Sequence, residues 1–380
     1  MDLRSDLTST EYQRYARHLA IPELGTEGQT RLKNARVLCI GAGGLGAPAT
    51  LYLAAAGIGK IGIVDADVVE LSNLQRQILY SEADLGRLKV EAARERLQGM
   101  NPDIEICLHP ERFKAENAMR IVAQYDVVID GTDNFPTRYL SNDVCFWQKK
   151  PNIYGSILRF EGQVAVFAPH LGGPCYRCMS PTPPTPGLVP TCAEGGVLGA
   201  LPGIIGTFQA LECIKLITGL GQPLLGRLLH VNTLSMRFRE FQLRRDPECP
   251  VCGEHPTITN PIDYDSFCHL SPKPSMKEIS VQELAQLRQK NEPHLLVDVR
   301  EPDEYHVARI EGSRLLPLAQ VAQHSTELPR DIPIYIHCKL GGRSAKAVTQ
   351  LEAQGFSNVF NVIGGIQAWS LHIDPTVPVY

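Results

Sequence analysis

The segment His337–Ser344, HCKLGGRS, places a cysteine at the head of a glycine turn with an arginine behind it. An apolar run, IPIYIHC, precedes the turn, and a helix-like run, SAKAVTQLEAQG, follows it. A thiol at such a strand–turn–helix junction meets backbone N–H groups and a helix N-terminus, and both favour the thiolate. We expect Lys339 and Arg343 to add positive charge. The pattern predicts a nucleophile at Cys338 and argues against an inert core thiol.

The length of this loop narrows the chemistry that it can perform. Protein phosphatases use CxxxxxR, in which the loop is wide enough for a phosphate group. Here four residues separate Cys338 from Arg343, which gives CxxxxR. The shorter loop suits a smaller cargo, a sulfane sulfur carried on the cysteine as a persulfide.

A second chemical motif, GAGGLG, lies between a predicted strand and a predicted helix near the start of the chain. Its glycines Gly41, Gly43 and Gly46 form a GxGxxG pattern, in which the backbone approaches phosphates at a helix N-terminus. Asp65 follows Gly46 by 19 positions, where a carboxylate usually meets ribose hydroxyls. That placement argues against a glycine turn packed without a ligand. The motif alone leaves an NAD dehydrogenase open.

Polar and cationic residues then follow in a set that hydride transfer does not need. They are Asn73, Gln75, Arg76, Lys89, Asp133 and Asn134. ATP chemistry does need them, because cations hold a polyphosphate and an acidic residue places Mg²⁺. The alternative for Arg76 and Lys89 is solvated surface charge, the usual fate of single basic residues. For Lys89 that alternative stays open.

Two CxxC pairs, CYRC and CPVC, supply Cys175, Cys178, Cys249 and Cys252. Four thiolates make a tetrahedral zinc site. The pairs are 71 positions apart, so the metal would join two distant segments and would not nucleate a single finger. Each pair alone could be a redox motif, but two pairs in a reducing compartment favour Zn²⁺.

Another cysteine, Cys192, follows the proline-rich stretch SPTPPTPGLVP. We expect this loop to be exposed. Free cysteines are usually buried and inert, so exposure favours a nucleophile over an incidental thiol.

Strands alternating with helices must position these residues. Apolar runs predict strands over 36–40, 60–65, 104–109, 125–134 and 162–169, and helical patterns predict helices over 81–102, capped by Ser81, and 203–219. This alternation indicates an α/β protein with a Rossmann-like, mostly parallel sheet. Further strands over 294–300 and 332–338 predict a second, smaller α/β domain.

The segment 255–276 loses periodicity and collects Pro, Ser and Asp, so we predict a linker there. The domains are then 1–254, with the nucleotide motifs and the zinc site, and 277–380, with the cysteine loop.

Composition excludes several classes of function. The net charge of −4 leaves no basic footprint for nucleic acid or an anionic membrane. No apolar run reaches about 18 residues, and the N-terminal stretch has no signal-peptide core, so we expect no membrane span and no export. Eleven cysteines without an export signal predict a reducing, cytoplasmic location.

The segments GAGGLGAP, LAAAGIGKIGIVDADVVELSNLQRQILY and DGTDNFPTRY together resemble the MoeB/ThiF adenylyltransferases, relatives of ubiquitin-activating enzymes, over roughly residues 8–253. That family adenylates the C-terminal glycine of a ubiquitin-like sulfur carrier. The resemblance implies a structural zinc and a homodimer in which Arg17 reaches ATP across the interface. The residues expected to bind ATP and Mg²⁺ are Gly44, Asp65, Ser72, Asn73, Leu74, Gln75, Arg76, Lys89, Asp133 and Asn134, of which Arg76 and Asp133 are expected to be catalytic. Cys192 matches a position that forms a thioester or disulfide with the carrier.

The segment LLVDVREPDEYHVARIEGSRLLPL, with HCKLGGRS and GGIQAW, resembles a single-domain rhodanese over roughly residues 277–380. Asp298 and Arg300 match a strand-end pair that we expect to be structural. One departure is ARIEGS, where rhodaneses commonly show a GHIPGA-like segment.

The two resemblances join into one hypothesis. The first domain adenylates a carrier of the MoaD/ThiS type, and a persulfide on Cys338, loaded by a sulfur donor such as a cysteine desulfurase, converts the adenylate to a thiocarboxylate. Thiocarboxylates of this kind feed molybdenum cofactor synthesis, thiamine synthesis or tRNA thiolation. The alternatives are a ubiquitin-like protein activator that works through a Cys192 thioester, an NAD oxidoreductase, and a scaffold without turnover.

Overall fold

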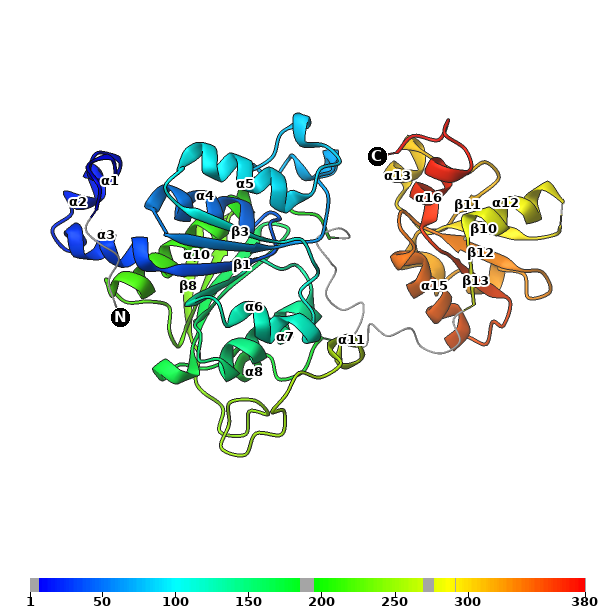
Figure 1. Cartoon of the computed structure of the whole chain (residues 1–380). Helices are drawn as coiled ribbons and strands as arrows, with labels where there is room; N and C mark the ends of the chain where they lie inside the picture. Colours follow the sequence, from blue (N-terminus) through cyan, green and yellow to red (C-terminus); the bar gives the residue numbers. More distant parts are fainter. Residues whose placement is uncertain (1–6, 185–194, 269–276, 291, 380) are drawn as a thin grey trace. The chain divides into compact units, whose positions relative to one another are not determined.

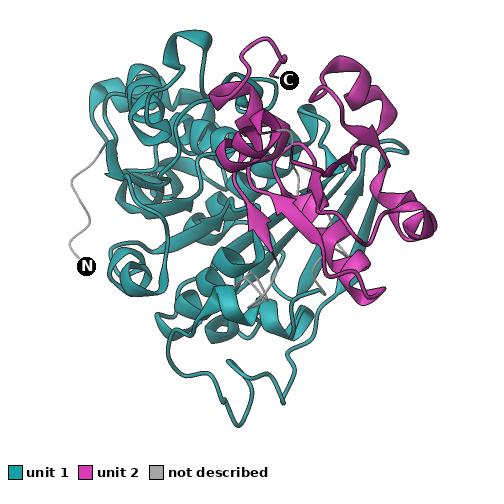
Figure 2. Ribbon diagram, turned by 90° about the vertical axis from the view of Figure 1, so that its right-hand side faces the viewer, with its two compact units in different colours: residues 1–270 teal, residues 271–380 magenta. Residues whose placement is uncertain are grey.

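The computed structural model describes residues 7–184, 195–268, 277–290 and 292–379. The chain forms two compact units, Met1–Leu270 and Ser271–Tyr380, coloured separately in Figure 2. Each unit has its own sheet and its own hydrophobic core.

Unit 1 contains an eight-stranded sheet with the order β3-β2-β1-β4-β5-β6-β7-β8. Its strands are β1 (Arg36–Ile40), β2 (Lys60–Val64), β3 (Glu105–His109), β4 (Val127–Asp130), β5 (Asn152–Leu158), β6 (Glu161–Phe167), β7 (Arg227–Asn232) and β8 (Arg237–Gln242). The first five strands are parallel, and β6, β7 and β8 pair antiparallel. The predicted mostly parallel α/β class is confirmed.

Helices cover both faces of this sheet, as Figure 1 shows. One face carries α3 (Gly25–Asn34), α4 (Gly46–Ala56), α5 (Lys89–Met100) and α10 (Ala200–Thr218), and the other carries α6 (Ala115–Val122), α7 (Phe135–Trp147) and α8 (Tyr176–Met179). Strands β1 and β4 are buried by both layers, which explains why their sequences are continuous apolar runs.

Helix α10 is the one described helix whose length and composition would suffice to cross a membrane. It packs on α4, β5 and β6, so it is a core helix of unit 1. Its Gln209 is fully buried and donates to the backbone oxygens of Asp130 and Ile153. The apolar spacing predicted for 203–219 therefore reflects packing on the sheet.

The helix predicted over 81–102 with Ser81 as its cap is wrong at its start. Ser81 is instead the N-cap of the 3₁₀ turn η2 (Glu82–Asp84), and its backbone N–H donates to the Asp84 carboxylate at 2.9 Å. The long helix, α5, begins only at Lys89. Asp84 was available as a closer partner for Ser81, so a local turn formed before the helix.

Unit 2 contains a five-stranded parallel sheet with the order β11-β10-β12-β13-β9. Its strands are β9 (Glu278–Ile279), β10 (Leu295–Asp298), β11 (Arg314–Leu315), β12 (Ile334–His337) and β13 (Val359–Val362). Its helices are α12 (Val281–Gln289), α13 (Pro302–Val307), α14 (Leu318–Val321), α15 (Gly342–Ala353) and α16 (Gly365–His372). The predicted second, smaller α/β domain is confirmed as a fold.

Part of the stretch predicted as a linker, 255–268, belongs to unit 1, and the rest of it, 269–276, lies outside the described residues. Within 255–268, the short helix α11 (Tyr264–Phe267) lies on α7, and Tyr264 is buried. The Tyr264 hydroxyl donates to Asp143 Oδ2 at 3.0 Å. The domain boundaries themselves stay a prediction.

Asp143 is the centre of a buried cluster that joins α7, α8 and α11. Its carboxylate accepts from Arg177 Nε and Nη2, each at 2.8 Å, and both side chains are fully buried. The Arg177 guanidinium also lies over the rings of Tyr139 and Phe267, 4.7 and 4.6 Å from their centroids. The sequence offered no signal for this cluster, because the ion pair spans 34 positions.

We predict that Arg177→Ala lowers the free energy of unfolding of unit 1 by about 3–5 kcal/mol, because it leaves a buried carboxylate uncompensated. The measurement is denaturant unfolding followed by Trp147 fluorescence in a Trp369→Phe background, since the chain has two tryptophans. Arg120→Ala is the control, because its ion pair with Glu111 is exposed and should contribute about 0–1 kcal/mol. Equal losses in the two variants would contradict the prediction.

Candidate functional site

The glycine loop lies between the carboxyl end of β1 and the start of α4. Gly41 has φ +90°, a conformation that side chains other than glycine rarely adopt. A Cβ on Gly46 would lie 1.9 Å from the backbone oxygen of Gly41. The loop is therefore folded so tightly that both positions require glycine.

Asp65, which follows β2, stabilises this loop through hydrogen bonds to its carboxylate. Its Oδ2 accepts from the Ala42 N–H at 2.8 Å, and its Oδ1 accepts from the Asp67 N–H at 2.8 Å. Burial raises the pKa of Asp65, and the nearby charge of Lys89 offsets part of that rise. The carboxylate is thus hydrogen-bonded to the backbone of the predicted phosphate loop.

Lys89 is buried at the N-terminus of α5, so the alternative of a solvated surface charge is wrong for this residue. Its Nζ lies 2.9 Å from Asp67 Oδ2, and its backbone N–H donates to the Asp67 oxygen. Asp67 is itself exposed on the β2 side of the loop. The pair holds a lysine next to Asp65.

The segment around η1 (Leu71–Asn73) lies against the glycine loop from the other side. The Arg76 Nη1 donates to the Ser72 oxygen at 2.8 Å, and a Cβ on Gly44 would lie 3.7 Å from Arg76 Cγ. Asn73 is buried and its Oδ1 accepts from the Glu70 N–H. Of the other predicted contacts here, Ser72 and Gln75 are exposed and Leu74 is half-buried.

The carboxyl end of β4 brings the second acidic motif to the same sheet edge. Asp133 is exposed, whereas Asn134 caps α7 through a hydrogen bond from the Thr137 N–H to its Oδ1 at 3.0 Å. A Cβ on Gly41 would lie 3.0 Å from the Gly131 oxygen, so the two loops touch. The exposed Asp133 side chain is thus available to contact a ligand, whereas Asn134 is the N-cap of α7.

Sequence reasoning missed the residue that fixes this turn. Arg138 is buried on α7 and donates from Nη2 to the backbone oxygens of Thr132 and Gly155, at 3.0 and 3.1 Å. Its guanidinium lies over the Tyr154 ring, 4.8 Å from the centroid. The motif DGTDNFPTRY contains Arg138, so the motif itself was the available signal.

The three loops converge because their strands are parallel neighbours. Strands β2, β1 and β4 lie side by side, and Gly41, Asp65 and Asp133 follow their carboxyl ends. The chain leaves β1 toward β2 on one side and reaches β4 on the other, which creates a switch point in strand order. Open α/β sheets bind ligands at such a crevice.

Of the residues predicted to be catalytic in unit 1, Arg17 does not lie at this edge. Arg17 lies in α2 (Ala16–Leu19), is exposed, and makes no hydrogen bond or ion pair with the residues that the structure describes. Cys192 lies outside the described residues. Their predicted roles stay predictions.

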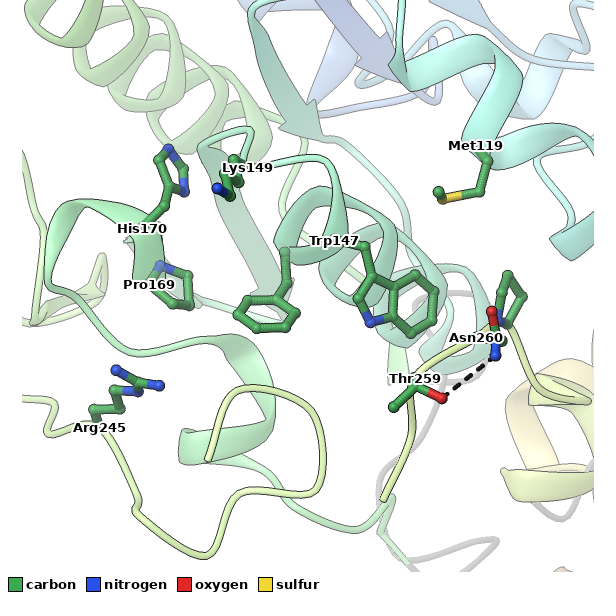
Figure 3. Close-up of a pocket in the computed structure, with 10 residues that line it drawn as sticks. Met119, Trp147, Lys149, Pro169, His170, Arg245, Thr259 and Asn260 are labelled. Atoms are coloured by element: carbon green, nitrogen blue, oxygen red, sulfur yellow. Dashed lines mark hydrogen bonds between the residues drawn. The ribbon is translucent and has the colours of Figure 1, made fainter. Parts of the chain in front are cut away.

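A groove of about 510 Å³ lies at the opposite edge of the sheet, next to the amino end of β5. Phe146 and Trp147 line it together with Lys149, His170 and Arg245, and Figure 3 draws the lining residues as sticks. Burial lowers the pKa of His170, and Lys149 and Lys150 lower it further. Because it lies across the sheet from the glycine loop, this groove is separate from the predicted nucleotide site.

The four CxxC cysteines gather into one cluster that joins α8 to the segment after β8. Their sulfur atoms all lie within 4.8 Å of one another. The separations are 3.8 Å for Cys175–Cys178, 3.5 Å for Cys175–Cys249 and 3.3 Å for Cys178–Cys252. A tetrahedral zinc with Zn–S bonds of about 2.3 Å needs edges of about 3.8 Å, so the donors fit that ion. The hydrogen bond with Cys175 lowers the pKa of the Cys178 thiol.

We predict about one zinc per chain in purified protein. Cys252→Ser should lose the metal and unfold at a lower temperature, because the cluster joins segments more than 70 residues apart. Elemental analysis and thermal unfolding measure both effects. Cys107→Ser, on the half-buried cysteine of β3, is the control and should keep its zinc. A zinc content far below one per chain in the wild type would contradict the assignment of the four cysteines as a zinc site.

In unit 2, Cys338 directly follows β12 and is only 2% exposed. Its Sγ accepts from the Gly341 N–H at 3.1 Å, and the Ser344 Oγ lies 3.4 Å from this sulfur, while the closest acceptor of the Ser344 hydroxyl is Asn361 Oδ1 at 2.7 Å. Gly341 has φ +103°, and α15 begins at the next residue. The predicted strand–turn–helix placement of the thiol, with a backbone N–H donating to the sulfur, is confirmed.

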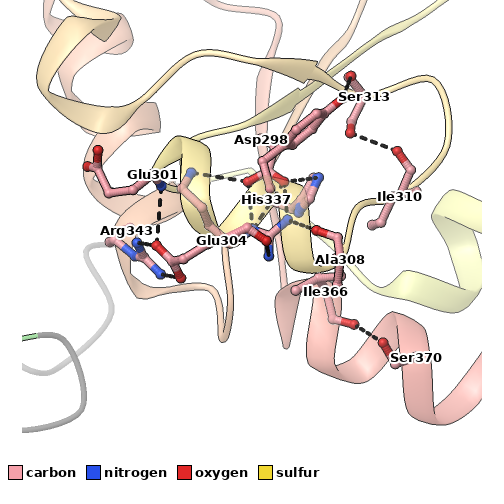
Figure 4. A network of polar contacts seen from close by, with 12 residues as sticks. Asp298, Glu301, Glu304, Ala308, Ile310, Ser313, His337, Arg343, Ile366 and Ser370 are labelled. Atoms are coloured by element: carbon pink, nitrogen blue, oxygen red, sulfur yellow. Dashed lines mark hydrogen bonds and ion pairs between the residues drawn. The ribbon is translucent and has the colours of Figure 1, made fainter. Parts of the chain in front are cut away.

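We expected Arg343 to add positive charge to this loop, but an acidic side chain offsets that charge. Its guanidinium is paired with Glu304 on α13, at 2.5 Å for Nη1–Oε2 and 2.7 Å for Nη2–Oε1. Figure 4 shows this pair beside the Asp298 network. Sequence reasoning missed Glu304, because the two residues are 39 positions apart.

Behind the loop lies a buried ion pair. Asp298 and Arg300 are fully buried, and Arg300 Nε donates to Asp298 Oδ1 at 2.9 Å. Arg300 also donates to the backbone oxygens of Glu304 and Ala308. His337, next to the cysteine, is fully buried, and burial lowers its pKa to about 4, so it is neutral at pH 7. This geometry is structural, as we expected for Asp298 and Arg300.

Comparisons with known proteins follow the same division of the chain. A model of the ThiF family matches residues 15–251, and one of the rhodanese-like domain matches residues 280–372. The chain is 46% identical to a probable adenylyltransferase/sulfurtransferase, MoeZ, of Mycobacterium tuberculosis, over 99% of this chain and 97% of that one. It is 41% identical to the adenylyltransferase and sulfurtransferase MOCS3 of Mus musculus, over 99% and 89%. A crystal structure of E. coli MccB with ATP matches with a TM-score of 0.55 and 25% identity, over 63% of this chain and 74% of that one.

Proposed function

The chain belongs to the ThiF family, and we propose that it is an adenylyltransferase and sulfurtransferase that activates the C-terminal glycine of a ubiquitin-like sulfur carrier and converts it to a thiocarboxylate. The observation that carries the proposal is full-length similarity. One relative named for both activities is 46% identical over 99% of this chain, across both units. An NAD oxidoreductase or a scaffold without turnover does not fit this relationship.

In the first step, the carrier's terminal carboxylate attacks the α-phosphorus of ATP. A P–O bond forms, pyrophosphate leaves, and the product is an acyl-adenylate. The ThiF family binds ATP, and the glycine loop with Asp65 offers the edge at which the nucleotide would lie. Arg76 and Lys89 are the cations that would face its phosphates.

Asp133 is the residue that would hold Mg²⁺. It is exposed at the end of β4, and Asn134, not Asp133, caps the next helix. The ion would neutralise charge on the phosphates. Asn73 and Gln75 complete the proposed nucleotide contacts.

In the second step, a persulfide on Cys338 attacks the carbonyl carbon of the acyl-adenylate. A C–S bond forms, AMP leaves, and the carrier is joined to Cys338 through an acyl disulfide. The Cys192 thiolate then attacks the Cys338 sulfur. This releases the carrier thiocarboxylate and leaves a Cys192–Cys338 disulfide, which a cellular thiol reduces. The Gly341 N–H that donates to Cys338 Sγ supports its role as the sulfur-carrying residue.

The partners follow from these steps. The carrier is a protein of the MoaD/ThiS type, and the sulfur donor is a cysteine desulfurase, which supplies the persulfide. We also propose a homodimer in which Arg17 reaches the partner's nucleotide, since the Arg17 side chain is exposed and forms no hydrogen bond or ion pair with the described residues of its own chain. A cytoplasmic location would keep the many thiols reduced.

The test of this proposal is ATP–pyrophosphate exchange with candidate carriers. We expect exchange only when a carrier with an intact C-terminal glycine is present. A carrier without its last glycine is the matched control. Exchange that ignores the carrier, or no exchange with any carrier, would overturn the proposal.

A further inference from the structure

The arginine of the cysteine loop is not free to bind an anion with its full charge. Glu304 accepts two hydrogen bonds from Arg343, at 2.5 and 2.7 Å. Each side chain is 23% exposed, so the pair is partly open to solvent. Such two-bond pairing of guanidinium and carboxylate is both strong and geometrically specific.

The buried side chain of Arg300 also holds the backbone of Glu304 in place. Arg300 donates to the backbone oxygen of Glu304 at 3.3 Å and to that of Ala308 at 2.7 Å, and Asp298 fixes Arg300. These contacts are made to backbone oxygens of Glu304 and Ala308. A substitution of the Glu304 side chain would therefore leave them in place. Figure 4 shows Glu304 between this buried network and Arg343.

We propose that Glu304 determines which sulfur donors the Cys338 loop accepts. By neutralising Arg343, it disfavours small dianionic donors such as thiosulfate relative to persulfides. This inference rests on the proposed function, because it requires that Cys338 accepts sulfur.

The chemistry of the two donors differs in charge. With thiosulfate, the Cys338 thiolate attacks the outer sulfur, a new S–S bond forms, and sulfite leaves with the electron pair of the broken bond. With a persulfide, the same attack on the outer sulfur releases a thiolate. Thiosulfate brings two negative charges to the loop mouth, whereas cysteine persulfide brings one net negative charge. Without the negative charge of Glu304, Arg343 would attract the dianion more strongly.

The test is Glu304→Gln in the full chain. The amide keeps an acceptor for Arg343 but removes the negative charge. We expect the KM for thiosulfate to fall by about three- to tenfold, since one charge near the loop mouth is removed. The kcat/KM for cysteine persulfide should stay within about twofold, and the gain for thiosulfate should shrink as salt rises.

Two variants control for charge and for geometry. Asp303→Asn removes one charge from an exposed position of the same helix and should change neither KM by more than about twofold. Glu304→Asp keeps the charge and should keep the wild-type donor preference. A thiosulfate KM that is unchanged or raised in Glu304→Gln, or lowered equally in Asp303→Asn, would overturn the inference.

Intact mass separates this inference from the function on which it rests. The wild type should gain one sulfur atom on Cys338 from cysteine persulfide. If no donor sulfurates the wild type, the proposed function fails and the inference fails with it. If the wild type is sulfurated but Glu304→Gln shows the wild-type donor preference, only the inference fails.

Discussion

Cys338→Ala should abolish formation of the carrier thiocarboxylate, with a loss of at least about 10³-fold, because the residue that carries the sulfur is gone. ATP–pyrophosphate exchange should stay within about twofold of the wild type, since the glycine loop and Asp65 belong to the other unit. The measurement is intact mass of the carrier together with exchange of labelled pyrophosphate.

The control for this variant is Cys107→Ala, which removes a half-buried thiol of β3 that has no role in either step. It should retain both activities. Sulfur transfer at the wild-type rate by Cys338→Ala would mean that the persulfide forms elsewhere in the chain.

Asp133→Asn should lower carrier-dependent pyrophosphate exchange by about 10²–10³-fold, because it removes the carboxylate that would place Mg²⁺ against the phosphates. The fold should be unaffected, since Asp133 is exposed and Asn134 supplies the helix cap. Sulfuration of Cys338 by a persulfide should be unchanged, which separates a local chemical defect from misfolding.

Asp265→Asn is the matched control, because Asp265 is an exposed aspartate of α11 in the same unit. Exchange by this variant should match the wild type. If Asp133→Asn also kept full exchange across a range of Mg²⁺ concentrations, the assignment of this residue would be wrong.

Much of the fold could be predicted because its signals are local. The apolar runs of β1, β2 and β12 are continuous, since these strands are covered on both faces or lie in the centre of a sheet. The glycine motif also predicted the tight turn without further information, because Gly41 and Gly46 cannot hold a side chain in this turn. Local sequence therefore sufficed for the position of the loop.

The contacts that were not predicted join segments far apart in the chain. Arg343 pairs with Glu304 across 39 positions, and Tyr264 reaches Asp143 across 121. Each of these residues alone has the pattern of a surface charge or a loop aromatic. Only the packing of helices from separate segments brings such partners together, and sequence periodicity carries no information about that.

Ser81 shows a different kind of limit. A serine before an amphipathic pattern is a common start of a helix. Here the Asp84 carboxylate lies three residues away and bonds both the backbone N–H and the hydroxyl of Ser81. A local turn and a helix cap use the same residue types, so the pattern could not distinguish them.

The central claim is that the two units carry out successive steps of one reaction. The most direct test is the intact mass of a MoaD/ThiS-type carrier after incubation with the full chain, ATP and a persulfide donor. We predict the mass gain of one oxygen-to-sulfur exchange, and we predict that it requires both ATP and Cys338. A carrier that is adenylated but never gains sulfur, or that ends as a stable thioester on the enzyme, would contradict the claim.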